Sequence, residues 1–169
     1  MSLVPPRVLA LLLLAIIPSY AGAQALSPRN ANYTIAARLD AAAHTITGSE
    51  VITWRNITAR PAIDLQFHLY WNAWKHDRTT FMRERALGRS ASPDAIPAGD
   101  RSRIDVTSFR LTAPARVDLT ASMHVIAPDD GNPDDETVMA VPLREPVPPG
   151  GTATIELTWT AHVPRPVSS

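Results

Sequence analysis

The chain has 169 residues, enough for one domain with its own core and too few for two domains of ordinary size. Lys plus Arg and Asp plus Glu both total 16, which argues against nucleic acid and anionic membranes as partners, because both select a clustered basic excess. The absence of cysteine excludes disulfide bonds, thiolate metal sites and a cysteine nucleophile.

Residues 1–23 have the layout of a secretory signal peptide. A short segment ends at Arg7, an apolar stretch covers residues 8–17, and Ala21-Gly22-Ala23 fits an A-x-A cleavage site. An uncleaved membrane anchor competes with this interpretation, but the apolar stretch is about half the roughly 20 residues that a spanning helix needs. We therefore expect cleavage before Gln24, a secreted or periplasmic protein, and no stable membrane span after cleavage.

Residues 24–31 show no periodicity and are expected to be a flexible leader, followed by a folded domain over residues 32–164. Most of that domain alternates apolar and polar residues with the period of two that is typical of β-strands. The expected strands are residues 33–40, 45–56, 63–71, 104–111, 117–125, 137–143 and 152–162.

The same alternation predicts which side chains face a core. Ile104 and Val106 lie in one phase and Phe109 and Leu111 in the other, which predicts a bulge around residues 107–108. The other inward residues are expected to be Tyr33, Ile35, Ala37 and Leu39; Ile46, Ile52 and Trp54; Ile63, Leu65, Phe67, Leu69 and Trp71; Val117, Leu119, Ala121, Met123 and Val125; and Ala153, Ile155, Leu157, Trp159 and Ala161.

About seven strands and no sustained helical periodicity predict an all-β fold, an antiparallel saddle-like β-sandwich. The long polar connection over residues 75–103 is expected to hold one or two helical turns near residues 79–87, before Pro93 and Pro97. A connection of this length is either functional or an insertion. Residues 165–169 are expected to begin a linker.

No set of residues fits a catalytic or metal centre. The five histidines are scattered, and no pair has the spacing of the helical H-E-x-x-H zinc motif. His68 and His124 could meet across neighbouring strands, but two imidazoles without a third ligand make a poor metal site. No G-x-S-x-G elbow supports Ser-His-Asp catalysis. We therefore expect no catalytic, cofactor-binding or metal-ligating residue in this chain.

Two charged clusters also have structural explanations. The acidic run 129–136 is dense in oxygen ligands, but an EF-hand starting at Asp130 would need Gly at Asp135 and Glu at Val141. A turn whose Asp and Asn side chains bond the local backbone fits the run better. The basic cluster is mixed with Asp77 and Glu84 and is expected to solvate a loop. It comprises Lys75, Arg78, Arg83, Arg85 and Arg89.

Two features have no assigned role. Glu50 shares its strand phase with Ile46 and Trp54, where a carboxylate needs a partner or the edge of a sheet. Residues 32–34 and 56–58 read N-Y-T and N-I-T, and both fit the N-glycosylation sequon.

Several segments occur in an order that carries a family likeness. They are Tyr33-Thr34-Ile35 to Leu39-Asp40, Ile46-Thr47-Gly48-Ser49-Glu50 with Trp54-Arg55-Asn56, Phe67-His68-Leu69-Tyr70-Trp71-Asn72-Ala73-Trp74, Thr80-Phe81-Met82-Arg83-Glu84, Pro128-Asp129-Asp130-Gly131-Asn132 and Pro148-Pro149-Gly150-Gly151. In this order they resemble the N-terminal domain of aminopeptidase N-like zinc metallopeptidases, the gluzincin aminopeptidases. The likeness covers residues 33–164.

The resemblance implies a saddle-shaped β domain packed against a following thermolysin-like catalytic domain. In that family the zinc ligands, the general base and most contacts to the substrate amine belong to the catalytic domain, whose G-x-M-E-N and H-E-x-x-H motifs are missing here. We therefore expect a non-catalytic domain of a secreted zinc aminopeptidase, cut before its catalytic domain. Its partners would be that domain of the same polypeptide and, for the parent hydrolase, peptide substrates.

Tyr70 and Trp74 are the candidate residues for docking to the catalytic domain, and core packing is the alternative for both. Two other hypotheses compete with the aminopeptidase. One is a free-standing secreted or periplasmic β-sandwich that binds protein or carbohydrate, and the other is a structural module of an envelope assembly.

Overall fold

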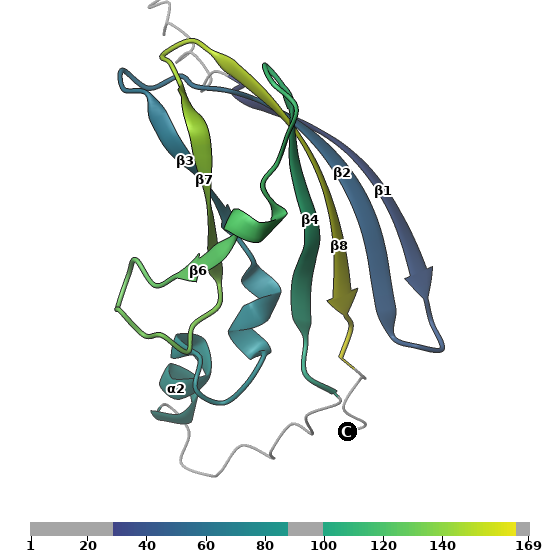
Figure 1. Ribbon diagram of the computed structural model, residues 1–169. Helices are drawn as coiled ribbons and strands as arrows, with labels where there is room; N and C mark the ends of the chain where they lie inside the picture. Colours follow the sequence, from purple (N-terminus) through teal and green to yellow (C-terminus); the bar gives the residue numbers. More distant parts are fainter. Residues whose placement is uncertain (1–28, 88–99, 165–169) are drawn as a thin grey trace, which may run out of the picture.

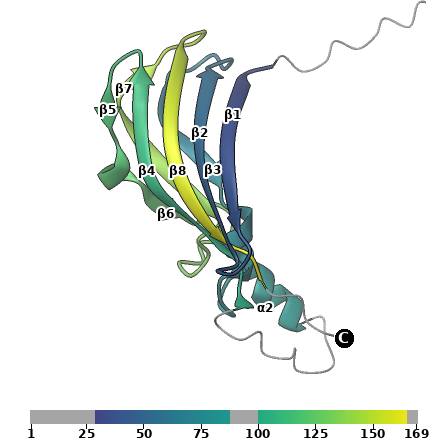
Figure 2. The same cartoon turned by 90° about the vertical axis from the view of Figure 1, so that its right-hand side faces the viewer.

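The computed structural model describes residues 29–87 and 100–164 and folds them into two antiparallel β-sheets (Figure 1). The larger sheet has five strands in the order β1-β2-β8-β4-β5, and the smaller has three in the order β3-β7-β6. The long strands of the larger sheet are curved (Figure 2). The predicted all-β sandwich-like fold is confirmed. The predictions for residues 1–23 and 165–169 lie outside the described residues, as do residues 24–28 of the leader predicted over residues 24–31. Within that leader, Ala31 already belongs to β1 and Asn30 O accepts a hydrogen bond from Arg55 N at 2.8 Å.

The strands and helices have the following bounds. The strands are β1 Ala31–Asp40, β2 Thr45–Arg55, β3 Ala62–His68, β4 Arg103–Ala113, β5 Val117–Asp118, β6 His124–Ile126, β7 Val138–Val147 and β8 Thr152–His162. The helices are the 3-10 helices η1 Tyr70–Trp74 and η3 Thr120–Ser122, and the α-helix α2 Thr80–Leu87. Helix α2 agrees with the helical turns predicted near residues 79–87. No helix in the described ranges is long and apolar enough to cross a membrane.

Strand β8 holds the larger sheet together. It pairs along its length with β2 on one side and with β4 on the other. Its bounds are those predicted, and Ala153, Ile155 and Leu157 are buried as the alternation requires.

The predicted bulge in β4 is present. The pairing of β4 with β8 shifts register between Val106 and Ser108. The extra residue restores the inward phase, so that Phe109 and Leu111 are buried in the core. The Phe109 ring meets Phe67 of the smaller sheet edge to face, with centroids 5.4 Å apart. Burial of such side chains contributes about 1.5–3 kcal/mol each.

Strand β1 departs from the prediction. Tyr33, Ile35 and Leu39 are 60%, 57% and 63% exposed, although the alternation places them on a core face. The alternation of β1 is genuine, but β1 is the edge strand of the larger sheet. The core cluster draws on β2, β8 and β4 of this sheet and on β3 and β7 of the other, so the inner face of β1 is left uncovered.

Two further predicted strands are corrected. The strand predicted over residues 63–71 ends at His68, and Trp71 lies in η1. Ile63 is 67% exposed because the pairing of β3 with β7 is irregular between Ala62 and Asp64. The strand predicted over residues 117–125 is divided into β5 and β6, which belong to different sheets with η3 between them. Ala121 and Val125 are consequently exposed.

The two charged clusters of the sequence lie against each other. Asp134 forms ion pairs with two arginines: Arg78 Nε lies 3.1 Å from its Oδ1, and Arg83 Nη2 lies 3.2 Å from its Oδ2. Lys75 forms an ion pair with Glu136. All five side chains remain at least partly exposed to solvent, so each pair contributes at most about 1 kcal/mol. The pairs join the acidic run to the segment of α2.

The acidic run is the turn that was predicted. The backbone N–H of Asn132 donates to Asp130 Oδ1, and that of Thr137 donates to Asp135 Oδ1, both at 3.0 Å. The Asn132 amide crosses to Arg78 O at 3.0 Å. Arg89 of the basic cluster lies outside the described residues.

Candidate docking groove

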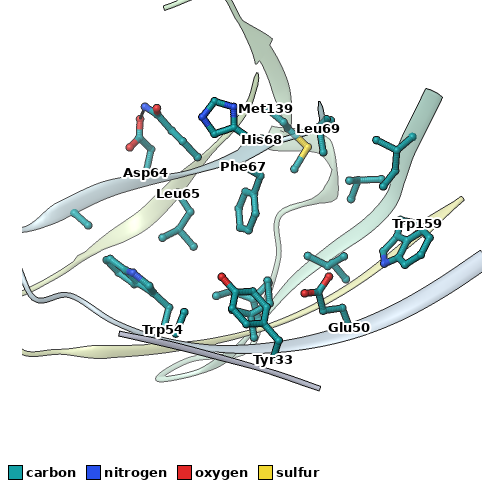
Figure 3. A pocket seen from close by; sticks show the side chains of 18 of the residues that line it. Tyr33, Glu50, Trp54, Asp64, Leu65, Phe67, His68, Leu69, Met139 and Trp159 are labelled. Atoms are coloured by element: carbon teal, nitrogen blue, oxygen red, sulfur yellow. Dashed lines mark hydrogen bonds between the residues drawn. The ribbon is translucent and has the colours of Figure 1, made fainter. Parts of the chain in front are cut away.

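The two sheets separate along one side and leave an open groove between them (Figure 3). Its volume is about 730 Å³. Ile52, Ile155 and Leu157 of the larger sheet line one wall. Leu65, Phe67 and Leu69 come from β3 and the residue that follows it, and line the opposite wall.

The groove exists because the larger sheet continues past the smaller one. Tyr33 pairs with Ile52, and Ile35 pairs with Glu50, so these four residues lie on one face of the sheet. Ile52 is covered by the smaller sheet, whereas Tyr33 and Ile35 are exposed. The groove therefore continues into an apolar surface on β1.

Glu50 is the acidic residue that this wall presents to the groove. Its neighbours in register are Ile35 on β1 and Leu157 on β8. Figure 3 shows Glu50 on the same wall as Tyr33. No hydrogen bond or ion pair joins its carboxylate to another described residue. Burial alone raises the pKa of this carboxyl. The strand phase that made Glu50 anomalous in the sequence is therefore correct, and its position one strand from the edge leaves it partly accessible.

Tyr70 borders the groove. It is 69% exposed and stacks on His68 with ring centroids 5.0 Å apart and planes 8° apart. A second hollow, lined by Leu69, Tyr70, Trp71 and Trp159 among others, shares Leu69 and Trp159 with the groove. The apolar surface thus extends from β1 across the groove to Tyr70.

Trp74, the second docking candidate, has a different environment. It is partly buried and packs on Phe81 of α2, with ring centroids 4.8 Å apart. The structure therefore brings Tyr70 to the groove and gives Trp74 a packing role in joining η1 to α2.

His68 and His124, which the sequence placed on possible neighbouring strands, lie on strands that are not adjacent. Strand β7 separates β3, which carries His68, from β6, which carries His124. His124 Nδ1 lies 3.1 Å from Ser122 O. Among the described residues, no group of three His, Asp or Glu side chains is placed to hold a metal ion.

The two sequons differ in accessibility. Asn32 is exposed on β1, whereas Asn56 is fully buried. The Asn56 amide nitrogen donates to Arg60 O at 2.8 Å and to Val147 O at 2.9 Å. Glycosylation of Asn56 is incompatible with this folded state, because the same nitrogen would have to carry the sugar.

Sequence reasoning missed the groove but held one signal for it. Glu50 on an otherwise apolar strand face indicated a face that is not fully closed. Comparison with protein-family models and with curated proteins finds no match. The molecule is an open two-sheet β-sandwich with an apolar groove, and its function is argued from that groove.

Proposed function

We propose that this chain is the non-catalytic N-terminal domain of a secreted zinc-dependent aminopeptidase. In this proposal it packs against the catalytic domain of the same polypeptide and shapes the access of peptide substrates to it. Zinc and peptide hydrolysis belong to that second domain. The observation that carries the proposal is the uncovered apolar surface that runs from Tyr33 and Ile35 of β1 to Tyr70.

The apolar character of this surface favours a protein neighbour. Contiguous apolar patches above a few hundred Å² are uncommon on isolated domains and mark interaction sites. Domains of one chain typically bury about 600–1,500 Å² against each other. Three side chains on β1 are more than half exposed on the groove face: Tyr33, Ile35 and Leu39. Their burial is worth about 25 cal/mol per Å² of apolar area.

The segment order described above supports the choice of an aminopeptidase. It covers residues 33–164, from β1 to the end of β8, and thus includes the strands on both sides of the groove. A docking role for this domain would account for the exposed apolar side chains on β1 and for the exposure of Tyr70.

The first test is the reading frame that follows codon 169. We expect it to encode G-x-M-E-N and then H-E-x-x-H within about one domain's length. The longer product should hydrolyse aminoacyl anilides and lose this activity to a chelator, while the 169-residue chain should be inert with or without zinc. A stop codon directly after Ser169, with no metallopeptidase sequence nearby, would overturn the proposal.

A second test examines docking in the longer product. Tyr70→Arg should loosen the contact and speed cleavage between the domains in limited proteolysis. Ile63→Arg is the matched control, because Ile63 is 67% exposed but lies outside the groove lining. Equal cleavage rates for the two variants would remove Tyr70 from the interface.

The groove also favours a second candidate function, a free-standing secreted or periplasmic β-sandwich that binds a ligand. A volume of about 730 Å³ lies within the range of about 300–1,000 Å³ that is typical of ligand sites. The reading-frame test separates the two candidates, because a free-standing module requires no catalytic motifs downstream.

A further inference from the structure

We propose that the free edge of β1, together with the groove that it borders, binds an extended apolar peptide segment that carries one Lys or Arg side chain, and that the Glu50 carboxylate binds that cation. The inference rests on the proposed function only for the source of the segment, which is the docked catalytic domain. Binding itself is a property of this chain and is tested on it alone.

Charge complementarity supports a cationic occupant. The groove is lined by Glu50 and Asp64 and by no Lys or Arg of the described ranges. Figure 3 shows Asp64 and Leu65 on opposite sides of the β3 ribbon, with Asp64 on the side away from Tyr33. The Gln66 amide donates to Asp64 Oδ2 at 3.4 Å. Glu50 instead lies on the same wall as Tyr33. The interior of the groove therefore presents one carboxylate on an apolar surface.

The surroundings of Glu50 strengthen the expected contact. Ile35 and Leu157 flank it in register, and Trp159 lies on the same sheet face. A charge pair is stronger where apolar side chains exclude water than on an open surface. Burial already disfavours the lone carboxylate, as the raised pKa of Glu50 records, and a cation would relieve that penalty.

The free edge of β1 favours an extended segment. Within the described residues β1 pairs only with β2, so its other edge leaves backbone N–H and C=O groups without partners over a ten-residue strand. An added strand is a common mode of peptide binding at such an edge. Strands lie about 4.8 Å apart, so Glu50 is about 10 Å from the added backbone. The four-carbon stem of Lys, extended over Ile35, and the Glu50 side chain together bridge that distance.

The test uses three blocked peptides and the exported chain. The probes are N-acetyl-Thr-Val-Leu-Lys-Leu-Val-Thr-amide and the same peptide with Gln or Glu in place of Lys. Backbone NMR titrations should show shifts on β1 and β2 and an affinity for the Lys peptide at least fivefold above that for the Gln peptide. The Glu peptide should bind most weakly.

Two isosteric variants decide the role of Glu50. Glu50→Gln should abolish the preference for Lys and leave the affinity for the Gln peptide unchanged. Asp64→Asn, which removes the other acidic side chain at the groove, should preserve the preference. Equal affinities of the three peptides for the native chain would overturn the proposal, as would loss of the preference in Asp64→Asn and not in Glu50→Gln.

The remaining outcomes are equally decisive. Binding of decylammonium at the groove without binding of any peptide would assign the site to small amphiphiles and overturn the peptide. A titration that detects no binding of any peptide would overturn this inference. It would not affect the reading-frame test of the aminopeptidase proposal, so the failures of the two proposals can be told apart.

Discussion

The indole of Trp159 lies directly against the backbone of Gly48. A Cβ placed on Gly48 would be 2.3 Å from Trp159 Cζ2 and 2.4 Å from Cε2. The two residues are partners in register between β2 and β8, so a side chain at position 48 would project to the face that the ring occupies. Glycine is the residue that leaves room for this ring beside the groove.

We expect Gly48→Ala to destabilise the fold by about 1–3 kcal/mol, because the methyl group forces the ring of Trp159 out of place. Urea unfolding of the two proteins measures the difference. Ser49→Ala, at the neighbouring exposed position, should change stability by less than about 0.5 kcal/mol. In a Trp159→Leu background the Gly48→Ala effect should shrink, and strict additivity would show that the ring is not the obstacle.

Because the pairing of β3 is irregular, we expect substitutions of two nearby aliphatic residues on this strand to differ in their effect on stability. Leu65→Ala should lower the free energy of unfolding by about 2–5 kcal/mol, because Leu65 is 7% exposed in the core. Ile63→Ala should be within about 0.5 kcal/mol of the native protein, because Ile63 is 67% exposed. Comparable losses of stability would restore the simple alternation and contradict the register shift.

Asn56 joins two loops from a buried position. Its amide nitrogen donates to Arg60 and Val147, and its Oδ1 accepts from the backbone N–H and the hydroxyl of Thr58. Asn56→Asp replaces a double donor with an acceptor that faces two carbonyls, and should destabilise the fold by about 3 kcal/mol at neutral pH. Thermal unfolding measures the effect. Asn32→Asp, at the exposed sequon, should be close to neutral, and a similar loss there would contradict the contrast in burial.

Glu50 should make stability depend on pH in a particular direction. Its pKa is raised by burial above the ordinary value of 4.5, so the folded state binds the proton more tightly than the unfolded state. The contribution of Glu50 to stability therefore falls as pH rises from about 4.5 through its folded pKa. Glu50→Gln should match the native protein in acid and become the more stable of the two at neutral pH.

Asp118 provides the control of opposite sign. A hydrogen bond from the Thr120 hydroxyl is the largest cause that lowers its pKa, and the Thr120 backbone N–H adds to it. Its contribution is present above the ordinary pKa and is lost as pH falls through the folded pKa. Asp118→Asn should therefore lose stability at neutral pH and approach the native protein in acid. Parallel pH profiles for the two variants would contradict the assignments.

The sequence predicted β8 and the bulge of β4 because both strands are covered by the second sheet. There, alternation and burial coincide, and a change of phase such as that between Val106 and Phe109 has to be repaired by an extra residue. On β1 the same alternation correctly predicts a strand, but the face that it predicts to be buried is exposed. Periodicity reports which side chains share a face and carries no information on whether another sheet covers it.

The prediction of one strand over residues 117–125 was wrong for a different reason. Its alternation is regular, but the structure divides it between two sheets through η3, where the Thr120 hydroxyl contacts the backbone of Phe109 at 3.0 Å. Such a crossing depends on the position of β4 and is not encoded in the local pattern. For Glu50 the local pattern was informative. A carboxylate on an otherwise apolar strand face indicated a face that is not fully covered, and the groove accounts for it.

The central place of β8 has a consequence for how the chain folds as it is made. Strands β1 and β2 on one side, and β4 and β5 on the other, are joined into one sheet only through β8, which follows all of them in sequence. Until residue 162 has left the ribosome, both halves of this sheet keep an open edge where β8 will pair. Before β8 is available, the β1-β2 pair and the β4-β5 pair expose edges that strands of other proteins could pair with, and a chaperone that shields such edges would act in that interval.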